Sequence, residues 1–202
     1  VAAQPSTPAE SILSATTNFY TFTHFKDVLF IEVKRARRYG FPLALAVMAF
    51  DPIDGKMTPR LQEQLMGGLA VAIRRSLRDT DYPVQLADDR VLILMPHTDL
   101  AGSLIVARRI CERVSKASLS IDGARVQPSI SVGVAAGEPS REYSFSDLVR
   151  QAQEGLQTAM SLAATLTAAG QFDAARALHA ELGAISAEVV PVILLAGLCE
   201  LR

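Results

Sequence analysis

The chain has 202 residues, of which 50% are hydrophobic and 20% are charged, and its formal net charge is -1. This is the balance of a folded globular protein rather than of a disordered chain. A near-neutral charge argues against a protein that holds long nucleic acids by their phosphates, because such binding needs many Lys and Arg residues together. Local clusters of basic residues could still hold a small anionic ligand.

Neither the cysteines nor the histidines form a recognisable site. Cys111 and Cys199 are far apart in apolar helical contexts, so we expect no disulfide and a reducing, cytoplasmic compartment. His24, His97 and His179 lack the spacing of metal ligands, and we expect no metal site built on them.

The two ends of the chain indicate a fragment of a longer protein. The longest apolar run, Val189 to Leu198, is broken by Pro191 and is too short to cross a bilayer, so we expect no membrane segment here. The chain begins at Val1 without a secretory signal.

The sequence predicts both helices and strands, interspersed along the chain. The first fifteen residues are small, polar and proline-containing, which predicts a linker. Helical spacing of apolar residues predicts four helices, at Phe22 to Tyr39, Pro59 to Arg78, Leu100 to Lys116 and about Asp147 to Ala168. Extended apolar runs predict four strands, at Leu43 to Phe50, Tyr82 to Leu86, Val91 to Met95 and Val126 to Ala135.

Polar residues mark several helix ends. Gly40 is a stop signal for the first helix, Thr98 or Asp99 can cap the third, and Ser144 or Ser146 can cap the fourth.

The stretch between Arg78 and Pro96 organises the rest of the chain. Its two strand-like runs are separated by the polar pair Asp88-Asp89, which predicts a β-hairpin with its tip there. This stretch resembles the central hairpin of the GGDEF family, the bacterial diguanylate cyclases that condense two GTP molecules into cyclic di-GMP. The family's tip reads Gly-Gly-Asp/Glu-Glu-Phe. The corresponding residues here are Ala87, Asp88, Asp89, Arg90 and Val91.

The resemblance extends from about Asn18 to Met160 and implies the family's fold. This is an α/β (α+β) architecture in which a central, mostly antiparallel five-stranded sheet is surrounded by helices. The expected organisation is a linker over 1–15, a degenerate GGDEF domain over 16–160 and a C-terminal extension over 161–202.

The positions that correspond to the family's catalytic residues are largely altered. In the family, one metal ligand is the first Asp of a D-x-D loop, which falls on Ala49, while the second Asp of that loop is kept as Asp51. The other metal ligand is the acidic third residue of the hairpin motif, which is kept as Asp89. The Glu that reads guanine falls on Arg90, and the Lys that meets phosphate falls on Met160. One metal carboxylate of two is insufficient for a two-metal site, so the resemblance implies a catalytically inactive protein without a cofactor.

The family's inhibitory site, by contrast, has its motif intact. Arg78 and Asp81 match R-x-x-D at the family's spacing before the tip. An Arg fork can pair with guanine O6 and N7, and an Asp can accept from guanine N1–H and N2–H. Ungapped counting places the family's two further cationic residues on Arg109 and Arg35. The resemblance therefore implies a cyclic di-GMP receptor, with a ligand-bridged homodimer as one way to relay the signal.

Simpler interpretations remain open for each of these residues. Arg78 and Asp81 could form a solvated ion pair between residues three apart, and Arg109 and Arg35 could belong to solvated basic faces. The Asp88-Asp89 pair is also typical of a tight turn.

Beyond Met160 the sequence changes character. Ser161 to Leu182 resembles one tetratricopeptide-type helical hairpin, and a second unit could begin at Val189. These helices could bind a protein partner or simply pack on the domain. We therefore keep three hypotheses, namely a cyclic di-GMP receptor, a ligand-independent interaction scaffold and a pseudo-enzyme that still holds GTP.

Overall fold

The computed structural model describes residues 11–51, 58–87, 90–121, 123–126, 128–139, 143–168 and 192–196. Its helices are α1 (Phe22–Tyr39), α2 (Pro59–Arg74), α3 (Leu100–Ser115) and α4 (Phe145–Ala168). Its strands are β1 (Tyr20–Thr21), β2 (Leu43–Phe50), β3 (Tyr82–Ala87), β4 (Arg90–Pro96), β5 (Leu119–Ile121), β6 (Ala124–Val126), β7 (Ile130–Gly137) and β8 (Val192–Ala196).

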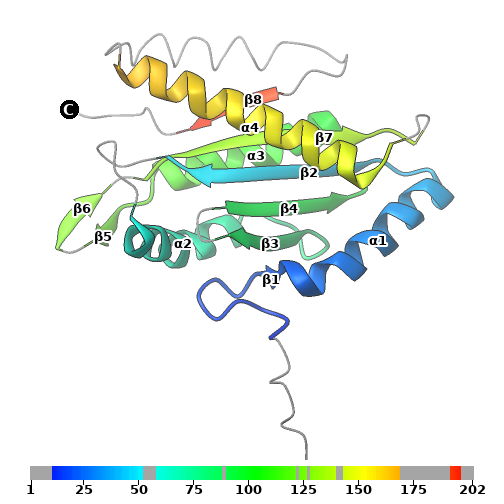
Figure 1. Ribbon diagram of the computed structural model, residues 1–202, viewed down its shortest axis with the longest axis horizontal. Coiled ribbons are helices and arrows are strands. Elements are labelled where there is room, and N and C mark those ends of the chain that lie inside the picture. Colours follow the sequence, from blue (N-terminus) through cyan, green and yellow to red (C-terminus); the bar gives the residue numbers. More distant parts are fainter. Residues whose placement is uncertain are drawn as a thin grey trace, which may run out of the picture.

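Helices cover both faces of one central sheet (Figure 1). The strand order is β1-β3-β4-β2-β7-β8, with β1 parallel to β3 and every other pair antiparallel. Strands β5 and β6 form a separate hairpin. The predicted α+β fold is confirmed, and five strands of the sheet lie within the expected domain while β8 is added from the extension.

Strand β2 divides the core into two halves because successive side chains point to opposite faces. Ala44, Ala46, Met48 and Phe50 pack in one cluster with residues of α2 and α3. Leu43, Leu45, Val47 and Ala49 pack in a second cluster with residues of α1 and α4. Helices α1 and α4 thus share one face of the sheet, and α2 and α3 share the other (Figure 1).

The helix ends follow the local signals in the sequence. Gly40 ends α1 in the left-handed conformation with φ of 68°. The Asp99 carboxylate caps α3 by accepting from the Gly102 amide at 2.7 Å. Ser144 precedes α4 and exchanges hydrogen bonds with Asp147, from the Asp147 amide to Ser144 Oγ at 3.1 Å and from the Ser144 amide to Asp147 Oδ2 at 3.0 Å.

Three expected boundaries differ from the structure. The strand predicted from Val126 to Ala135 is present as β7, but its predicted start is wrong, since β6 ends at Val126 and β7 begins at Ile130. Pro128 lies between them and has no amide hydrogen for a strand ladder. Helix α2 ends at Arg74 rather than Arg78, and the last part of the predicted linker forms a bridge between Leu13 and Tyr20.

The C-terminal extension agrees with its helical prediction over 161–168 and differs from it at β8. Helix α4 runs without interruption through the expected boundary at residues 160/161. The second helical unit expected from Val189 is wrong at Val192–Ala196, which pairs with β7 as an antiparallel strand. An Ile- and Val-containing apolar run next to Pro191 suits a strand once a sheet edge is available. Residues 169–191, with the rest of the predicted hairpin, lie outside the described residues.

One glycine sets how closely α4 approaches the sheet. A Cβ atom at Gly133 of β7 would lie 2.0 Å from the Ala152 carbonyl oxygen and 2.3 Å from the Leu156 amide nitrogen. Both neighbours are helix backbone, which cannot move aside as a flexible side chain would. Gly133 therefore allows backbone-to-backbone packing between α4 and β7.

We expect Gly133→Ala to lower the free energy of unfolding by about 3 kcal/mol, because the added methyl group must push α4 away from β7. Urea denaturation followed by circular dichroism measures the loss. Gly67→Ala is the matched control, since a Cβ there would make ordinary van der Waals contact with Thr16, at 3.5 Å from Cγ2 and 4.0 Å from the carbonyl oxygen. Alanine in the middle of α2 should raise stability by about 0.5–1 kcal/mol. Equal losses from both substitutions would contradict this account.

Candidate functional site

Arg78 and Asp81 form the two ends of a tight turn between α2 and β3. The Asp81 amide donates to the Arg78 carbonyl oxygen at 3.1 Å, and the Asp81 Oδ2 atom accepts from the Arg78 amide at 2.8 Å. Asp81 is 6% exposed, whereas Arg78 is an exposed residue. The turn thereby fixes the carboxylate while the guanidinium extends toward solvent.

The alternative of a solvated surface ion pair does not fit this geometry. Within the described part of the chain, the only hydrogen bond of the Asp81 carboxylate is the one from the Arg78 backbone to Oδ2. The structure has no direct ion pair there between the Arg78 guanidinium and the Asp81 carboxylate. Asp81 Oδ1 is thus an acceptor without a partner among those residues.

Two arginines of α3 attach that helix to the end of α2. The Arg109 Nη2 group donates to the Ser76 carbonyl oxygen, and the Arg113 Nη1 group donates to the Arg75 carbonyl oxygen at 2.7 Å. Arginines commonly satisfy the last carbonyls of a helix in this way. Arg109 Nε is buried and has no hydrogen-bond partner among the described residues, so part of its donor capacity is unused.

The charges around Asp81 are consistent with an anion-binding edge of the domain. Burial raises the pKa of the Asp81 carboxyl above its ordinary value, while the Arg78 amide and the positive charges of Arg78 and Arg109 act in the opposite direction. The structure therefore brings Arg78, Asp81 and Arg109 together, as the sequence led us to expect. We call these three residues the turn cluster.

Arg35 does not join the turn cluster. It lies on α1, which covers the face of the sheet opposite α3, and its Nη1 atom is 2.8 Å from Glu32 Oε1 in an ion pair. Glu32 is only 6% exposed, and the charges of Glu32 and Arg35 both act on the phenol of Tyr82. Burial, followed by the Glu32 charge, raises the pKa of Tyr82.

The hairpin tip lies at the other end of β3 from the turn cluster. Six residues of extended strand separate the two ends by roughly 20 Å. Asp88 and Asp89 are outside the described residues, and the pairing of β3 with β4 closes with Ala87 opposite Arg90. The next residue, Val91, is buried in the core.

Ala49 lies directly beside Arg90 in the sheet. The two residues are partners in the β2–β4 ladder, and Ala49 is 1% exposed. Its methyl group belongs to the apolar cluster beneath α1 and α4. The methyl group of Ala49 thus occupies the position where the resemblance to the GGDEF family implies a metal-binding carboxylate.

Asp51, after the end of β2, is held by two serines near β7. Its Oδ1 atom accepts from Ser131 Oγ and its Oδ2 atom accepts from Ser129 Oγ, both at 2.7 Å. Burial raises the pKa of the Asp51 carboxyl, against the opposing effect of the two hydroxyl donors. Both carboxylate oxygens are therefore used inside the fold.

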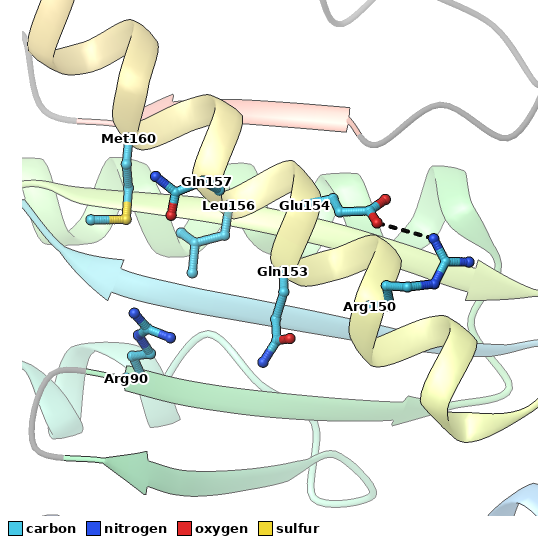
Figure 2. Close-up of a pocket in the computed structure, with 7 residues that line it drawn as sticks. All are labelled: Arg90, Arg150, Gln153, Glu154, Leu156, Gln157 and Met160. Atoms are coloured by element: carbon cyan, nitrogen blue, oxygen red, sulfur yellow. Dashed lines mark hydrogen bonds and ion pairs between the residues drawn. The ribbon is translucent and has the colours of Figure 1, made fainter.

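A pocket of about 350 Å³ lies between the hairpin and α4 (Figure 2). Arg90 enters it from β4, while Met160, Leu156 and Gln153 face it from α4 (Figure 2). The remaining lining residues are Arg150, Glu154 and Gln157, and Arg150 Nη1 is 3.0 Å from Glu154 Oε1. This pocket is thus lined by Arg90 and Met160, the two residues that stand where the GGDEF pattern has a Glu and a Lys.

Sequence reasoning missed several of these partners. The polar residues of α4 that line the pocket, Arg150, Gln153, Glu154 and Gln157, recur at helical spacing, so their common face could have been found. The bonds from Ser129 and Ser131 to Asp51 depend on the pairing of β2 with β7 and have no local signal.

Two kinds of feature are absent from the described residues. They contain no group of three or more His, Cys, Asp or Glu side chains placed to hold a metal ion. None of the helices within those ranges is long and apolar enough to cross a membrane.

Solved structures with the same fold come from bacterial signalling proteins. The FimX GGDEF domain of Pseudomonas aeruginosa superposes with a TM-score of 0.67 at 19% identity, covering 75% of this chain and 94% of that one. The GGDEF domain of DgcB from Caulobacter crescentus, solved in complex with c-di-GMP, gives 0.65 at 18% identity, covering 74% and 90%. Diguanylate cyclase SiaD from Pseudomonas aeruginosa, in complex with its activator SiaC, gives 0.65 at 21% identity, covering 73% and 57%.

Sequence comparison gives the same family. The chain is 27% identical over 134 residues to the response regulator PleD of Caulobacter vibrioides, which is 63% of this chain and 29% of that protein. It therefore spans less than a third of the length of this relative. The family model for the diguanylate cyclase GGDEF domain matches residues 14–162, which is well over half of the chain. Together with the fold, this match identifies the chain as a member of the GGDEF domain family.

Proposed function

We propose that this chain is a catalytically inactive GGDEF domain that binds cyclic di-GMP through the turn cluster and relays the signal to a partner or an adjacent domain. The observation that carries the proposal is the state of Asp81. Its carboxylate is oriented by a hydrogen bond to Oδ2, and Oδ1 has no partner among the described residues. A pre-positioned acceptor beside two guanidinium groups suits a guanine base attached to a phosphate.

Each residue of the turn cluster has a separate role in this proposal. The exposed guanidinium of Arg78 pairs with guanine O6 and N7, and Asp81 Oδ1 accepts from guanine N1–H and N2–H. Arg109 contributes positive charge near the phosphates while its Nη2 group stays on the Ser76 carbonyl oxygen. The DgcB domain, which shares this fold, was solved with c-di-GMP bound and supports the choice of ligand.

Arg35 has a different role in the proposal because it lies on α1, away from the turn cluster. This helix covers the face of the sheet opposite α3 and Arg109. Arg35 would act on a ligand held by a second copy, which is how a ligand-bridged homodimer would form. The ion pair with Glu32 orients the Arg35 guanidinium for such a contact.

The proposed loss of cyclase activity is argued from the residues on the hairpin-tip side of the sheet. Ala49 supplies no metal ligand, and both oxygens of Asp51 accept from serines. Arg90 and Met160 line the pocket at positions where the family has a carboxylate and an ammonium group. Several contributions to transition-state stabilisation are then missing together.

An interaction scaffold that needs no ligand is the second candidate. SiaD, another protein with this fold, was solved bound to its activator SiaC, so partner binding occurs among relatives. The C-terminal segment that we expected to recruit a partner lies largely outside the described residues. A binding experiment with nucleotides separates this candidate from the receptor.

Titration calorimetry with cyclic di-GMP should give saturable binding, and Arg78→Ala should weaken it by about 1–3 kcal/mol, the value of one bidentate guanine contact. Arg75→Ala is the matched control, because Arg75 is exposed on the same helix end and uses only its backbone carbonyl in the link to Arg113. GTP in place of the dinucleotide tests the pseudo-enzyme hypothesis. No heat with either ligand would support the scaffold, and binding of GTP alone would support nucleotide retention.

Binding of cyclic di-GMP should weaken as the pH falls from neutral toward about pH 4. The ionised carboxylate is the acceptor, and the pKa of Asp81 is raised by burial, so protonation removes the acceptor at a higher pH than for an ordinary Asp. Asp81→Asn should bind more weakly at neutral pH and lose most of this pH dependence. An affinity that is constant over this range in the wild type would remove Asp81 from the site.

Incubation with GTP and Mg²⁺ should yield no cyclic di-GMP above the background of a protein-free reaction. Chromatography of the nucleotides, with an active diguanylate cyclase as the positive control, measures the product. Steady formation of cyclic di-GMP would contradict the assignment of an inactive site, irrespective of binding at the turn cluster.

A further inference from the structure

The outer side of α1 combines positive charge with exposed apolar surface. The helix contains five basic and two acidic residues, and one of the acids, Glu32, is buried and paired with Arg35. Phe30 is 61% exposed in the middle of this helix. This concentration of positive charge on α1 contrasts with the net charge of -1 of the whole chain.

Four exposed residues, Lys26, Phe30, Lys34 and Arg37, follow one another along α1 at near-helical spacing. We call them the α1 stripe. Lys34 Nζ lies 4.0 Å from the centre of the Phe30 ring, so the ring and the cation are packed together. Arg37 is held by a hydrogen bond to the Tyr143 carbonyl oxygen. The stripe is thus partly ordered before any partner arrives.

A pocket of about 270 Å³ lies beside the stripe, between α1 and the beginning of α4. Its lining is apolar at Leu29, Phe30, Val33 and Phe145, with Lys26 and Arg37 adding cations. This volume is below the usual range of pockets for small-molecule ligands, about 300–1,000 Å³. It is of a size to receive one large apolar side chain.

We propose that the α1 stripe and this pocket dock an acidic peptide segment of a partner protein, with one aromatic or large aliphatic side chain in the pocket and flanking carboxylates on Lys26, Lys34 and Arg37. Charge complementarity selects an acidic partner, and the pocket selects an apolar anchor. The site lies on the face of the sheet opposite the turn cluster. It contains no residue of the turn cluster, so peptide docking and binding of cyclic di-GMP at that cluster can be tested separately.

A membrane surface is a poorer match for the same residues. A helix that inserts into a lipid interface needs a continuous apolar face. The apolar face of α1, with Phe25, Leu29 and Ala36, is already buried against the sheet. The large apolar residues of α1 that remain exposed, Phe30, Ile31 and Tyr39, lie among charged residues and form no continuous apolar face. Of these three, Phe30 lines the concave pocket, which suits a peptide side chain better than acyl chains.

The test uses the full chain and a fluorescein-labelled synthetic peptide of Asp and Glu residues with one central Phe. Fluorescence anisotropy should show saturable binding that weakens with added salt. Replacing the peptide's Phe with Ala, or introducing Phe30→Ala or Lys26→Glu in the protein, should each weaken binding by about tenfold, equal to 1.4 kcal/mol. Arg108→Glu is the matched control, because Arg108 is an exposed arginine on α3 at the other face.

Three outcomes would overturn the proposal. These are no saturable binding of the acidic peptide, an equal loss with Arg108→Glu, and binding to phosphatidylserine-containing vesicles in a flotation assay without binding of the peptide. Thermal melts of Phe30→Ala and Lys26→Glu identify any loss caused by unfolding. Lys34→Glu provides a third variant, at an exposed residue whose ammonium group packs on the exposed Phe30 ring. Calorimetry with cyclic di-GMP on Lys26→Glu should match the wild type, so failure of peptide docking is distinguishable from failure of the receptor.

Discussion

Burial of β2 on both faces is the constraint from which the arrangement of the molecule follows. All eight residues of Leu43–Phe50 are buried, and the strand hydrogen-bonds to β4 on one side and β7 on the other. Helices must then cover both faces, which places α1 and α4 together and α2 and α3 together. The separation of the turn cluster from Arg35 is a direct result, because their helices lie on different faces.

The same sheet keeps two chemically different regions apart. At one end of β3, a buried carboxylate is oriented by backbone and approached by two arginines. At the other end, Asp51 is engaged by two serines and Ala49 contributes only a methyl group to the core. The two regions share no hydrogen bonds, since the turn cluster adjoins β3 while Ala49 lies in β2 and Asp51 follows it.

Local sequence signals predicted the parts of the fold that depend on local physics. Asp99 and Ser144 cap helices because their side chains reach amides three residues ahead, and α1 begins and ends at the predicted residues. The short β5–β6 hairpin had no such signal, as each strand has only three residues. Strand β8 was missed because Val192–Ala196 takes its structure from the edge of β7, which is remote in sequence.

The candidate site was predictable to the same degree. The turn that joins Arg78 to Asp81 is local, and the positive charge of Arg109 acts on Asp81 in the assembled fold. The direction of Arg35 depends on which face of the sheet α1 covers, which its own periodicity does not reveal. The engagement of Asp51 depends on strand register between β2 and β7, again a property of the assembled sheet.

The missing side chain at Gly133 has a consequence for the neighbouring pocket. Because α4 lies directly on the backbone of β7, the height of the helix above the sheet sets how deep the space beneath Gln153, Leu156 and Met160 is. A methyl group introduced at this one interior position would lift the roof of that space while leaving every lining residue unchanged. The capacity of the pocket is thus governed by a residue that no ligand would ever touch.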